Sequence, residues 1–400
     1  MRGKERRVLI LGGKKKPLKR AKELGLEVAL VQKKESAGDE LGFADHVFLF
    51  DYEDEALLGR LGRAIHGALP FPHVLSFTEH GLVPAARLGE ELGLYGNSLF
   101  TATLLRDKWA MRQHLNRLGL GFVAAAPGAG AAGVRAFLAE LGRPVILKPV
   151  DGTASYGVIR VGDAAEAEAA CARLERLGVA RFIMEEFLDG PEVSVESFTA
   201  AGRHYVVAVT DKLILPSYVE IGHTMPSRLD GAAREAVCCL VREFLDASGL
   251  AFGPAHTEVK LTPAGPRVVE SHNRTGGDKI SDLVLAVYGV DFYTLSYQVL
   301  YGVGGEPDLE TLESRPARCG AAVRFFTAPP GTVVEVQGED RLRSAPGVEK
   351  YELLAKVGDR VNEVRDSRDR LGYVIVTAET AAAAGAAGDA LARRVRFVTR

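Results

Sequence analysis

The chain has 400 residues, of which 47% are hydrophobic and 26% charged, and its formal net charge is −2. This length and composition predict a globular protein of two or three domains. The near-neutral charge gives no reason to expect nucleic acid or an anionic membrane as a partner, and no apolar run is long enough to span a bilayer. The four cysteines, at 171, 238, 239 and 319, lack metal-ligand spacing, so we interpret them as buried thiols of a cytoplasmic protein.

Residues 1 to about 100 alternate short apolar strands with helices. Strands are predicted at 8–11, 27–31, 47–50 and 74–77, and helices at 13–24, 53–68 and 82–92. Strands separated by helices of this length predict a doubly wound parallel sheet. Gly12-Gly13-Lys14 follows the first strand, but the G-x-G-x-x-G spacing of a dinucleotide site is absent.

The next region opens with a predicted helix from about residue 103 to Leu118, with Thr103 or Asp107 as its N-cap. Lys108 lies early in this helix. A single lysine in a helix is usually solvated, and the helical periodicity alone does not assign a function to Lys108.

The stretch from Arg143 to Val158 reads RPVILKPVDGTASYGV. A short apolar strand ends at Lys148, and a loop of small residues and hydroxyls leads into a second strand. Such a loop can direct its backbone N–H groups at phosphate oxygens, and a lysine at the end of a buried strand is costly unless it meets an anion. The alternative is an ordinary hairpin with a flexible tip.

Acidic residues follow at the next strands. A predicted strand at 182–184 runs directly into Glu185 and Glu186, and after a turn an alternating strand places Glu192, Ser194 and Glu196 on one face. Two acids at the end of an apolar strand are unusual for a strand end alone. A solvated sheet face is the alternative interpretation of Glu192 and Glu196.

Two strand-like runs at 255–261 and 267–271 form a predicted hairpin in which Glu258 lies opposite Glu270. Directly opposed side chains have Cβ atoms about 4.5–5.5 Å apart, and like charges there are destabilising. A divalent cation that also holds phosphate oxygens would remove this repulsion. A solvated acidic hairpin is the alternative.

Polar residues flank this hairpin. Arg274 and two glycines follow it, and an arginine there suits a carboxylate or phosphate. Upstream, the loop 218–226 carries Glu220 and His223. A lone histidine is more often structural than catalytic, and only the neighbouring motifs favour a functional role for His223.

With these motifs in order, the chain resembles the ATP-grasp carboxylate–amine ligases over nearly its whole length. It is most similar to the L-amino acid ligases of the bacilysin dipeptide-synthetase type, because Glu220-Ile221-Gly222-His223 resembles their substrate-loop motif. The resemblance implies an ATP-grasp fold that combines α/β and α+β parts. We expect a parallel N-terminal domain at 1–100, an ATP-grasp domain at 101–315 and a small C-terminal α+β cap at 316–400. Within the ATP-grasp domain, 119–197 would bind ATP and 198–315 would hold metal and substrate.

The resemblance also implies roles for single residues. Lys108 and Lys148 would bind ATP phosphates beneath the glycine loop, the hinge would contact adenine, and Glu192 would bind the ribose. The loop contributes Gly152, Thr153, Ser155 and Gly157, and the hinge contributes Glu185, Glu186, Phe187 and Leu188.

The implied metal site uses Glu258 and Glu270 to bind Mg²⁺ or Mn²⁺. Many family members carry Glu-x-Asn at the second acid, whereas here His272 occupies the third place and Asn273 follows. The third ligand is therefore either His272 or Asn273.

The implied reaction is the joining of a small-molecule carboxylate to an amine, with an acyl phosphate as intermediate and ADP and phosphate as products. Arg274 would steady the acyl phosphate, while Glu220 and His223 would face the substrate amine and the transferring phosphate. A homodimer is compatible with this reading. Two alternatives remain open: an ATP-grasp ligase or carboxylase for a non-amino-acid metabolite or a carrier-bound acyl group, and a nucleotide-binding protein without turnover.

Overall fold

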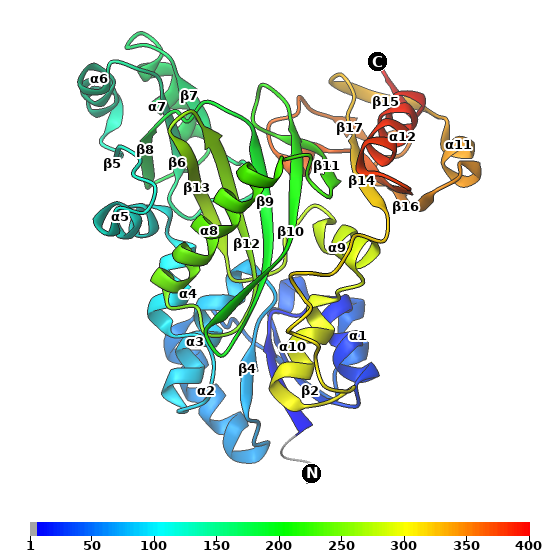
Figure 1. The fold of residues 1–400 in the computed structure, drawn as a ribbon. Coiled ribbons are helices and arrows are strands. Elements are labelled where there is room, and N and C mark those ends of the chain that lie inside the picture. The colour runs from blue at the N-terminus through cyan, green and yellow to red at the C-terminus, as the bar shows by residue number, and fades with distance from the viewer. Residues whose placement is uncertain (1–5) are drawn as a thin grey trace.

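The computed structural model describes residues 6–400 (Figure 1). Its N-terminal domain contains a four-stranded sheet in the order β3-β2-β1-β4, and every neighbouring pair is parallel. The strands are β1 (Arg7–Leu11), β2 (Glu27–Gln32), β3 (His46–Leu49) and β4 (His73–Leu75), and the helices are α1 (Lys15–Glu23), α2 (Glu55–Ala68) and α3 (Leu82–Glu91). The predicted parallel sheet is confirmed.

Strand β1 shows why the strands of this sheet are continuous runs of apolar residues. Val8 and Ile10 pack in the core shared with α1, whereas Leu9 and Leu11 pack in a second core with α2 and α3. A strand covered on both faces has no solvent side, so both sets of alternating residues are hydrophobic.

The predicted helix from about residue 103 to Leu118 is interrupted: the Asp107 alternative for its N-cap is confirmed, and a separate helix precedes it. The two helices are α4 (Leu99–Arg106) and α5 (Lys108–Leu118). Asp107 has extended backbone angles that end α4, and its side chain accepts a hydrogen bond from the backbone of Ala110, which caps α5.

The subdomain that we expect to bind ATP is a small four-stranded sheet in the order β5-β8-β6-β7, with two helices. Strands β6 and β7 flank the glycine loop. The strands are β5 (Ala125–Pro127), β6 (Val145–Pro149), β7 (Ile159–Val161) and β8 (Phe182–Glu186), and the helices are α6 (Gly130–Leu141) and α7 (Ala167–Arg176). Strand β8 therefore includes Glu185 and Glu186, which the sequence analysis placed beyond its end.

A large antiparallel sheet of eight strands forms the centre of the molecule. In sheet order these are β13 (Gly265–His272), β12 (Gly253–Thr262), β9 (Glu192–Ala200), β10 (Arg203–Ile214), β11 (Glu220–Met225), β14 (Gly320–Phe326), β18 (Gly372–Ala378) and β16 (Val348–Leu353). Because β11 pairs with β14, the sheet continues across residue 315, where we expected a domain boundary.

Three helices pack against or below this sheet: α8 (Gly231–Ser248), α9 (Ile280–Tyr288) and α10 (Phe292–Tyr301). The C-terminal region adds a three-stranded sheet, β17-β15-β19, of β17 (Arg360–Val361), β15 (Gly331–Gln337) and β19 (Arg396–Thr399), with helices α11 (Glu339–Ser344) and α12 (Ala381–Arg394). Within residues 6–400 no single helix is both long and apolar enough to cross a membrane; the sharply bent pair α9 and α10 would qualify by length and composition alone.

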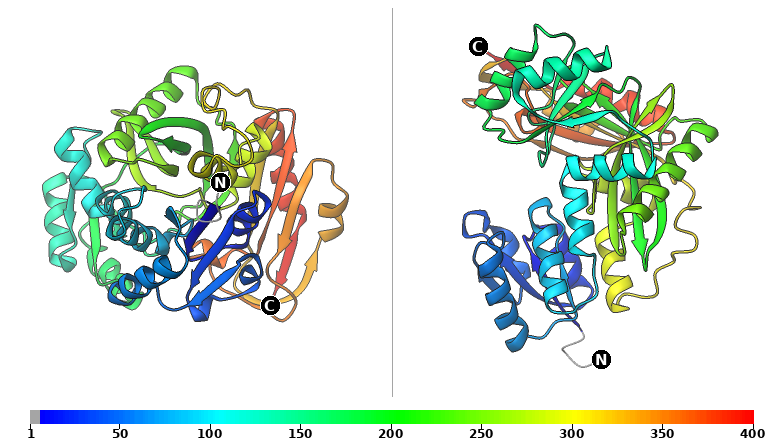
Figure 2. Two further views of the ribbon diagram at one scale, coloured as in Figure 1. Left: turned by 90° about the horizontal axis from the view of Figure 1, so that it is seen from below. Right: turned by 90° about the vertical axis from the view of Figure 1, so that its left-hand side faces the viewer.

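Figures 1 and 2 show how these parts surround a common centre. The N-terminal domain lies below the large sheet, the subdomain of β5 to β8 lies at its upper left, and the C-terminal region lies at its upper right in Figure 1. Side chains from all three parts can therefore reach one site.

Candidate active site

A cavity of about 730 Å³ lies where the three parts meet. Its lining includes every residue assigned a role in the sequence analysis except Gly157 and Asn273. Gly157 supports the loop from behind, because its backbone φ of +71° is a left-handed conformation that glycine adopts easily. The residues predicted from separate motifs thus converge on one place.

Lys148 projects from the end of β6 and forms an ion pair with Glu185 on β8. Glu185 also accepts a hydrogen bond from the fully buried Arg112 of α5, with 2.5 Å between its Oε1 and the arginine Nε. Burial would raise the pKa of Glu185, but Arg112 and Lys148 outweigh it and lower that pKa to about 2. Arg112 was missed by sequence reasoning, because one arginine in a polar helix carries no distinguishing pattern.

The predicted hairpin of β12 and β13 is confirmed, and its register pairs Glu258 directly with Glu270. Lys108 lies 2.9 Å from Glu270 and donates to the carbonyl of Gly152 in the glycine loop at 2.6 Å. Burial raises the pKa of Glu270, yet Lys108 and His272 hold it well below its usual value. Lys108 thus ties the start of the glycine loop to the acidic hairpin.

Glu258 is neutralised by a lysine that the sequence analysis overlooked. Lys212 of β10 is almost completely buried, and its Nζ lies 2.7 Å from Glu258, 2.5 Å from Glu192 and 3.2 Å from Glu220. Burial raises the pKa of Glu258, but Lys212 outweighs this and lowers it to about 2. A lysine following the apolar run of β10 was the signal that could have identified this residue.

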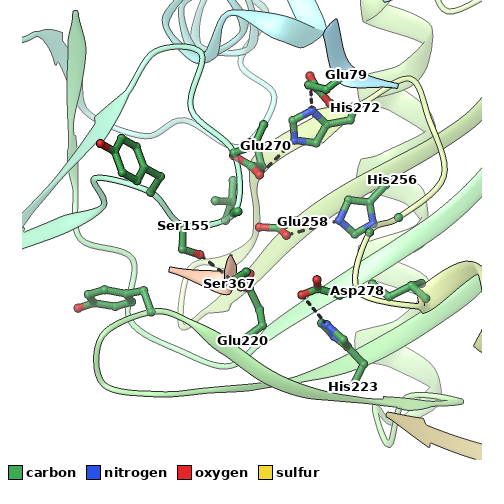
Figure 3. A pocket seen from close by; sticks show the side chains of 18 of the residues that line it. Glu79, Ser155, Glu220, His223, His256, Glu258, Glu270, His272, Asp278 and Ser367 are labelled. Carbon is green, nitrogen blue, oxygen red and sulfur yellow. Dashed lines mark hydrogen bonds and ion pairs between the residues drawn. The ribbon is translucent and has the colours of Figure 1, made fainter. Parts of the chain in front are cut away.

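The solvated-face alternative for β9 is wrong for Glu196, whose side chain is 1% exposed. Glu196 lies 2.5 Å from His256 Nδ1 and accepts a hydrogen bond from the backbone of Gly276. Burial would lower the pKa of His256, but Glu196 and Glu258 raise it to about 10. The charged imidazole thus adds positive charge beside the acidic hairpin (Figure 3).

Glu258 and Glu270 fit Mg²⁺ or Mn²⁺ by their chemistry, since both are ionised carboxylates on adjacent strands that face the cavity. Residues 6–400 contain no cluster of three or more acidic, histidine or cysteine side chains arranged to enclose a metal. Two carboxylates suffice for Mg²⁺, which usually retains waters and takes further oxygens from substrate phosphates.

The structure does not support either candidate for a third metal ligand. Both ring nitrogens of His272 face carboxylates, at 3.0 Å from Glu79 and 3.1 Å from Glu270, so neither is free (Figure 3). Asn273 follows the end of β13, where it donates to the Pro254 carbonyl at 2.9 Å and accepts from Asn97 at 2.6 Å. Glu270 and His272 share a face of β13, and Asn273 lies outside that strand.

Arg274 is held by an acid from the N-terminal domain. Glu79 begins a short 3₁₀ turn after β4, and its carboxylate accepts from Arg274 Nε at 2.6 Å and contacts His272. Burial raises the pKa of Glu79, but His272 and Arg274 shift it well below its usual value. Glu79 was missed because its partners are nearly two hundred residues away in sequence.

His223 is anchored through Asp278, another residue that sequence reasoning missed. The two lie 3.5 Å apart, and Asp278 also accepts two hydrogen bonds from Arg370 at 2.7 and 2.5 Å. Arg370 belongs to the C-terminal region and stacks over the ring of Phe325 at 3.7 Å. Burial raises the pKa of Asp278, but Arg370 and His223 hold it far below its usual value.

Glu220 joins the glycine loop to the C-terminal region. Its carboxylate accepts from Ser155 at 3.3 Å and from Ser367 at 3.2 Å (Figure 3). Ser155 and its neighbour Ala154 have φ angles of +59° and +60°, which are strained for residues other than glycine. These contacts hold the loop over the cavity.

The hinge is partly apolar and partly ionic. Phe187 lies beneath the guanidinium of Arg160 at 5.1 Å and meets the ring of Tyr218 edge-on at 6.3 Å. Glu186 turns away from these rings, accepting from the backbone of Ala124 at 2.9 Å and pairing with Arg143. The aromatic rings and Leu188 therefore offer an apolar surface at this end of the cavity.

Three family models match the chain in succession. They are an ATP-grasp N-terminal domain at residues 18–96, an ATP-grasp domain at 141–282 and the L-amino acid ligase C-terminal domain 2 at 324–400.

Named relatives and a solved structure agree with these matches. The alanine–anticapsin ligase of Bacillus subtilis is 32% identical over 263 residues, which is 59% of this chain and 55% of that protein. Human carnosine synthase 1 is 28% identical over 76% of this chain and 40% of its own length. The crystal structure of an L-amino acid ligase from Bacillus licheniformis matches with a TM-score of 0.83 and 23% identity, covering 99% of each chain. The chain therefore spans about half the length of the named ligases that it matches by sequence.

Both the family and the fold expected from the sequence motifs are confirmed by these matches. The chain therefore contains an ATP-grasp N-terminal domain, an ATP-grasp domain and a C-terminal domain of the L-amino acid ligase type.

Proposed function

We propose that this enzyme joins the carboxylate of one small molecule to the amine of another at the expense of ATP, and that at least one of the two is an amino acid. One observation carries the proposal. Lys108, Lys148 and Arg274 line the same cavity as the opposed carboxylates of Glu258 and Glu270. To bind a nucleoside triphosphate together with its divalent cation, a site requires cations for the phosphates and carboxylates for the metal.

Lys148 and Lys108 would bind ATP phosphates, and the loop from Gly152 to Gly157 would cover them. Phe187 and Leu188 would pack against adenine, and Glu192 would accept hydrogen bonds from the ribose. Glu258 and Glu270 would hold Mg²⁺, which supplies charge neutralisation for the transferring phosphoryl group. When ATP and metal bind, Lys108 and Lys212 would exchange their carboxylate partners for phosphate and metal-bound oxygens.

In the first step the substrate carboxylate oxygen attacks the γ-phosphorus, and the bond between that phosphorus and the β–γ bridging oxygen breaks, so ADP leaves. Both reactants are anions, so positioning and neutralisation by Lys108, Lys148 and Arg274 would supply the catalysis. In the second step the amine nitrogen attacks the acyl carbon, and the carbon–oxygen bond to phosphate breaks with the electron pair on phosphate. His223 or Glu220 would take the amine proton.

The sequence relatives that carry ligase names support amino acids as substrates. The prediction of four buried thiols is wrong, because only Cys238 is buried and Cys239 is exposed. All four cysteines are free thiols, and ATP is an intracellular substrate, so we place the enzyme in the cytoplasm.

The test supplies ATP, Mg²⁺ and pools of amino acids, and follows ADP release together with new amide masses. We expect ADP and phosphate to form in step with an amide, without AMP. If no amino acid stimulates ADP release but a non-amino or carrier-bound carboxylate does, the amino-acid assignment is wrong. Absence of ADP release with every carboxylate would contradict ligase activity.

A further inference from the structure

Two lysines that the proposed reaction leaves unused face the cavity from different parts of the chain. Lys14 follows the turn after β1 in the N-terminal domain, and Lys279 directly precedes α9. Both line the cavity, and within residues 6–400 neither ammonium group forms an ion pair or a side-chain hydrogen bond. We propose that Lys14 and Lys279 bind the free carboxylate of an amino acid that serves as the amine substrate.

The other cations at this end of the cavity already have partners. Arg274 is paired with Glu79 at 2.6 Å, and Lys16 is paired with Asp282 at 3.1 Å. Three acids lie near Lys279: Asp282 pairs with Lys16, Asp278 pairs with Arg370, and Lys350 opposes the effect of Glu352. Within residues 6–400 neither Lys14 nor Lys279 has an ion-pair partner of its own.

The surroundings of the two lysines disfavour their charged forms. Burial lowers the pKa of Lys14, and the charges of Arg274 and Lys279 lower it further. Burial also lowers the pKa of Lys279, with a further contribution from Lys350. A carboxylate placed between them would favour the charged form of both lysines.

Lys279 is held in place by the backbone and by an aromatic ring. Asp278 and Lys279 are consecutive residues with φ angles of +48° and +67°, a conformation that persists only where surrounding contacts enforce it. Arg370 fixes Asp278, and the Lys279 ammonium lies 4.3 Å from the centre of the Tyr373 ring. The backbone and the Tyr373 ring therefore fix the position of the Lys279 side chain.

The position of the pair indicates which substrate it would contact. A chain of contacts runs from the glycine loop through Lys108, Glu270 and His272 to Glu79 and Arg274. Lys14 lies close enough to Arg274 and Lys279 for their charges to lower its pKa, and within residues 6–400 neither lysine side chain forms an ion pair or hydrogen bond with a residue assigned to ATP. Since Arg274 would hold the acyl phosphate, we assign the two lysines to the incoming amine. An amino acid carries one fixed negative charge beside its nucleophilic nitrogen, and that charge is its carboxylate.

This inference rests on the proposed function. An assay with hydroxylamine as the amine distinguishes a failure of the inference from a failure of the proposed function. Hydroxylamine is small and uncharged, and its nitrogen displaces phosphate from an acyl phosphate to give a hydroxamate. It therefore reports formation of the acyl phosphate without using a carboxylate-binding site for the amine. Amino acid amides supply the second comparison, because they can act as amines but carry no carboxylate.

The experiment measures hydroxamate and dipeptide formation in wild type, Lys14→Ala and Lys279→Ala, with Lys15→Ala as the matched control. Lys15 is adjacent to Lys14 but pairs with Asp39 at the surface. We expect both variants to raise the KM for the amine amino acid by about tenfold or more, which is about 1.4 kcal/mol, while hydroxamate formation stays at the wild-type rate. Wild type should prefer the amino acid over its amide, and the variants should lose that preference.

An equal loss of hydroxamate formation would overturn the assignment, because the lysines would then serve acyl activation. An unchanged KM and an unchanged preference over the amide would also overturn it. If wild type forms no hydroxamate with any carboxylate, the proposed function itself fails, and the assignment of these lysines falls with it.

Discussion

At the scale of single residues, the site is a set of charges that compensate one another in the absence of nucleotide. Lys212 alone contacts three carboxylates, and Glu185 joins Arg112 to Lys148. Removing one member of a buried pair leaves an uncompensated charge, which is far more costly than losing an exposed pair. Substitutions in this set therefore report on binding as well as on stability.

Lys148→Ala should raise the Kd for ATP by about tenfold or more, or about 1.4 kcal/mol. The lysine ammonium would neutralise phosphate oxygens, and no other cation projects from the same strand end. Calorimetric titration with ATP measures the change. Lys22 is an exposed lysine of α1 that pairs with Asp45. The control variant Lys22→Ala should bind ATP as wild type does. Unchanged ATP affinity in Lys148→Ala would remove Lys148 from the nucleotide site.

Glu258→Gln and Glu270→Gln should abolish turnover at every Mg²⁺ concentration while the protein stays folded. Each variant removes one of two ionised carboxylates that would hold the metal, and an amide is a much poorer ligand for Mg²⁺. A Mg²⁺ titration of ADP release measures this effect, with circular dichroism to verify folding. Glu235→Gln on α8, whose side chain is 63% exposed, is the control. Full activity of either variant, or wild-type activity in excess chelator, would contradict the metal site.

At the scale of elements, the C-terminal region completes the site by bringing Arg370 to Asp278 and His223. We expect Arg370→Ala to reduce turnover by about tenfold or more with little change in the Kd for ATP, since the adenine and phosphate contacts are elsewhere. Arg370→Lys should restore turnover only in part, because lysine cannot make the bidentate contact. Steady-state rates and ATP titration measure the two effects. Arg365→Ala, an arginine 56% exposed in the same region, should behave as wild type.

Sequence patterns predicted elements best where a regular period could be followed. The alternation of two strands and a short turn was enough to place Glu258 opposite Glu270. Asp107 was one of two candidates for an N-cap, but the separate helix before it was not predicted, because a capping residue also fits inside a longer apolar period. Glu79 and Arg370 could not be found from the sequence, because their partners are set by the packing of separate parts.

At the scale of the whole molecule, buried carboxylates with lowered pKa values link folding to pH. A carboxylate whose pKa is lower in the folded than in the unfolded chain stabilises the protein above the unfolded pKa. That contribution is lost as the pH falls through the folded pKa. Glu185 and Asp278 both have lowered pKa values, and they lie in different parts of the molecule. Stability should therefore fall between about pH 5 and pH 2 throughout the protein.

Glu185→Gln tests this linkage at a site whose pKa is lowered from 4.5 to about 2. At pH 7 the variant should be less stable than wild type by about 3 kcal/mol, because Arg112 and Lys148 lose their shared counter-charge. The difference should shrink steadily as the pH falls from 5 towards 2, since wild-type Glu185 becomes protonated and loses the same interaction. Urea unfolding midpoints across this range measure it, with Glu140→Gln at an exposed position of α6 as the control. A difference that stays constant with pH would show that Glu185 does not contribute to stability through its charge.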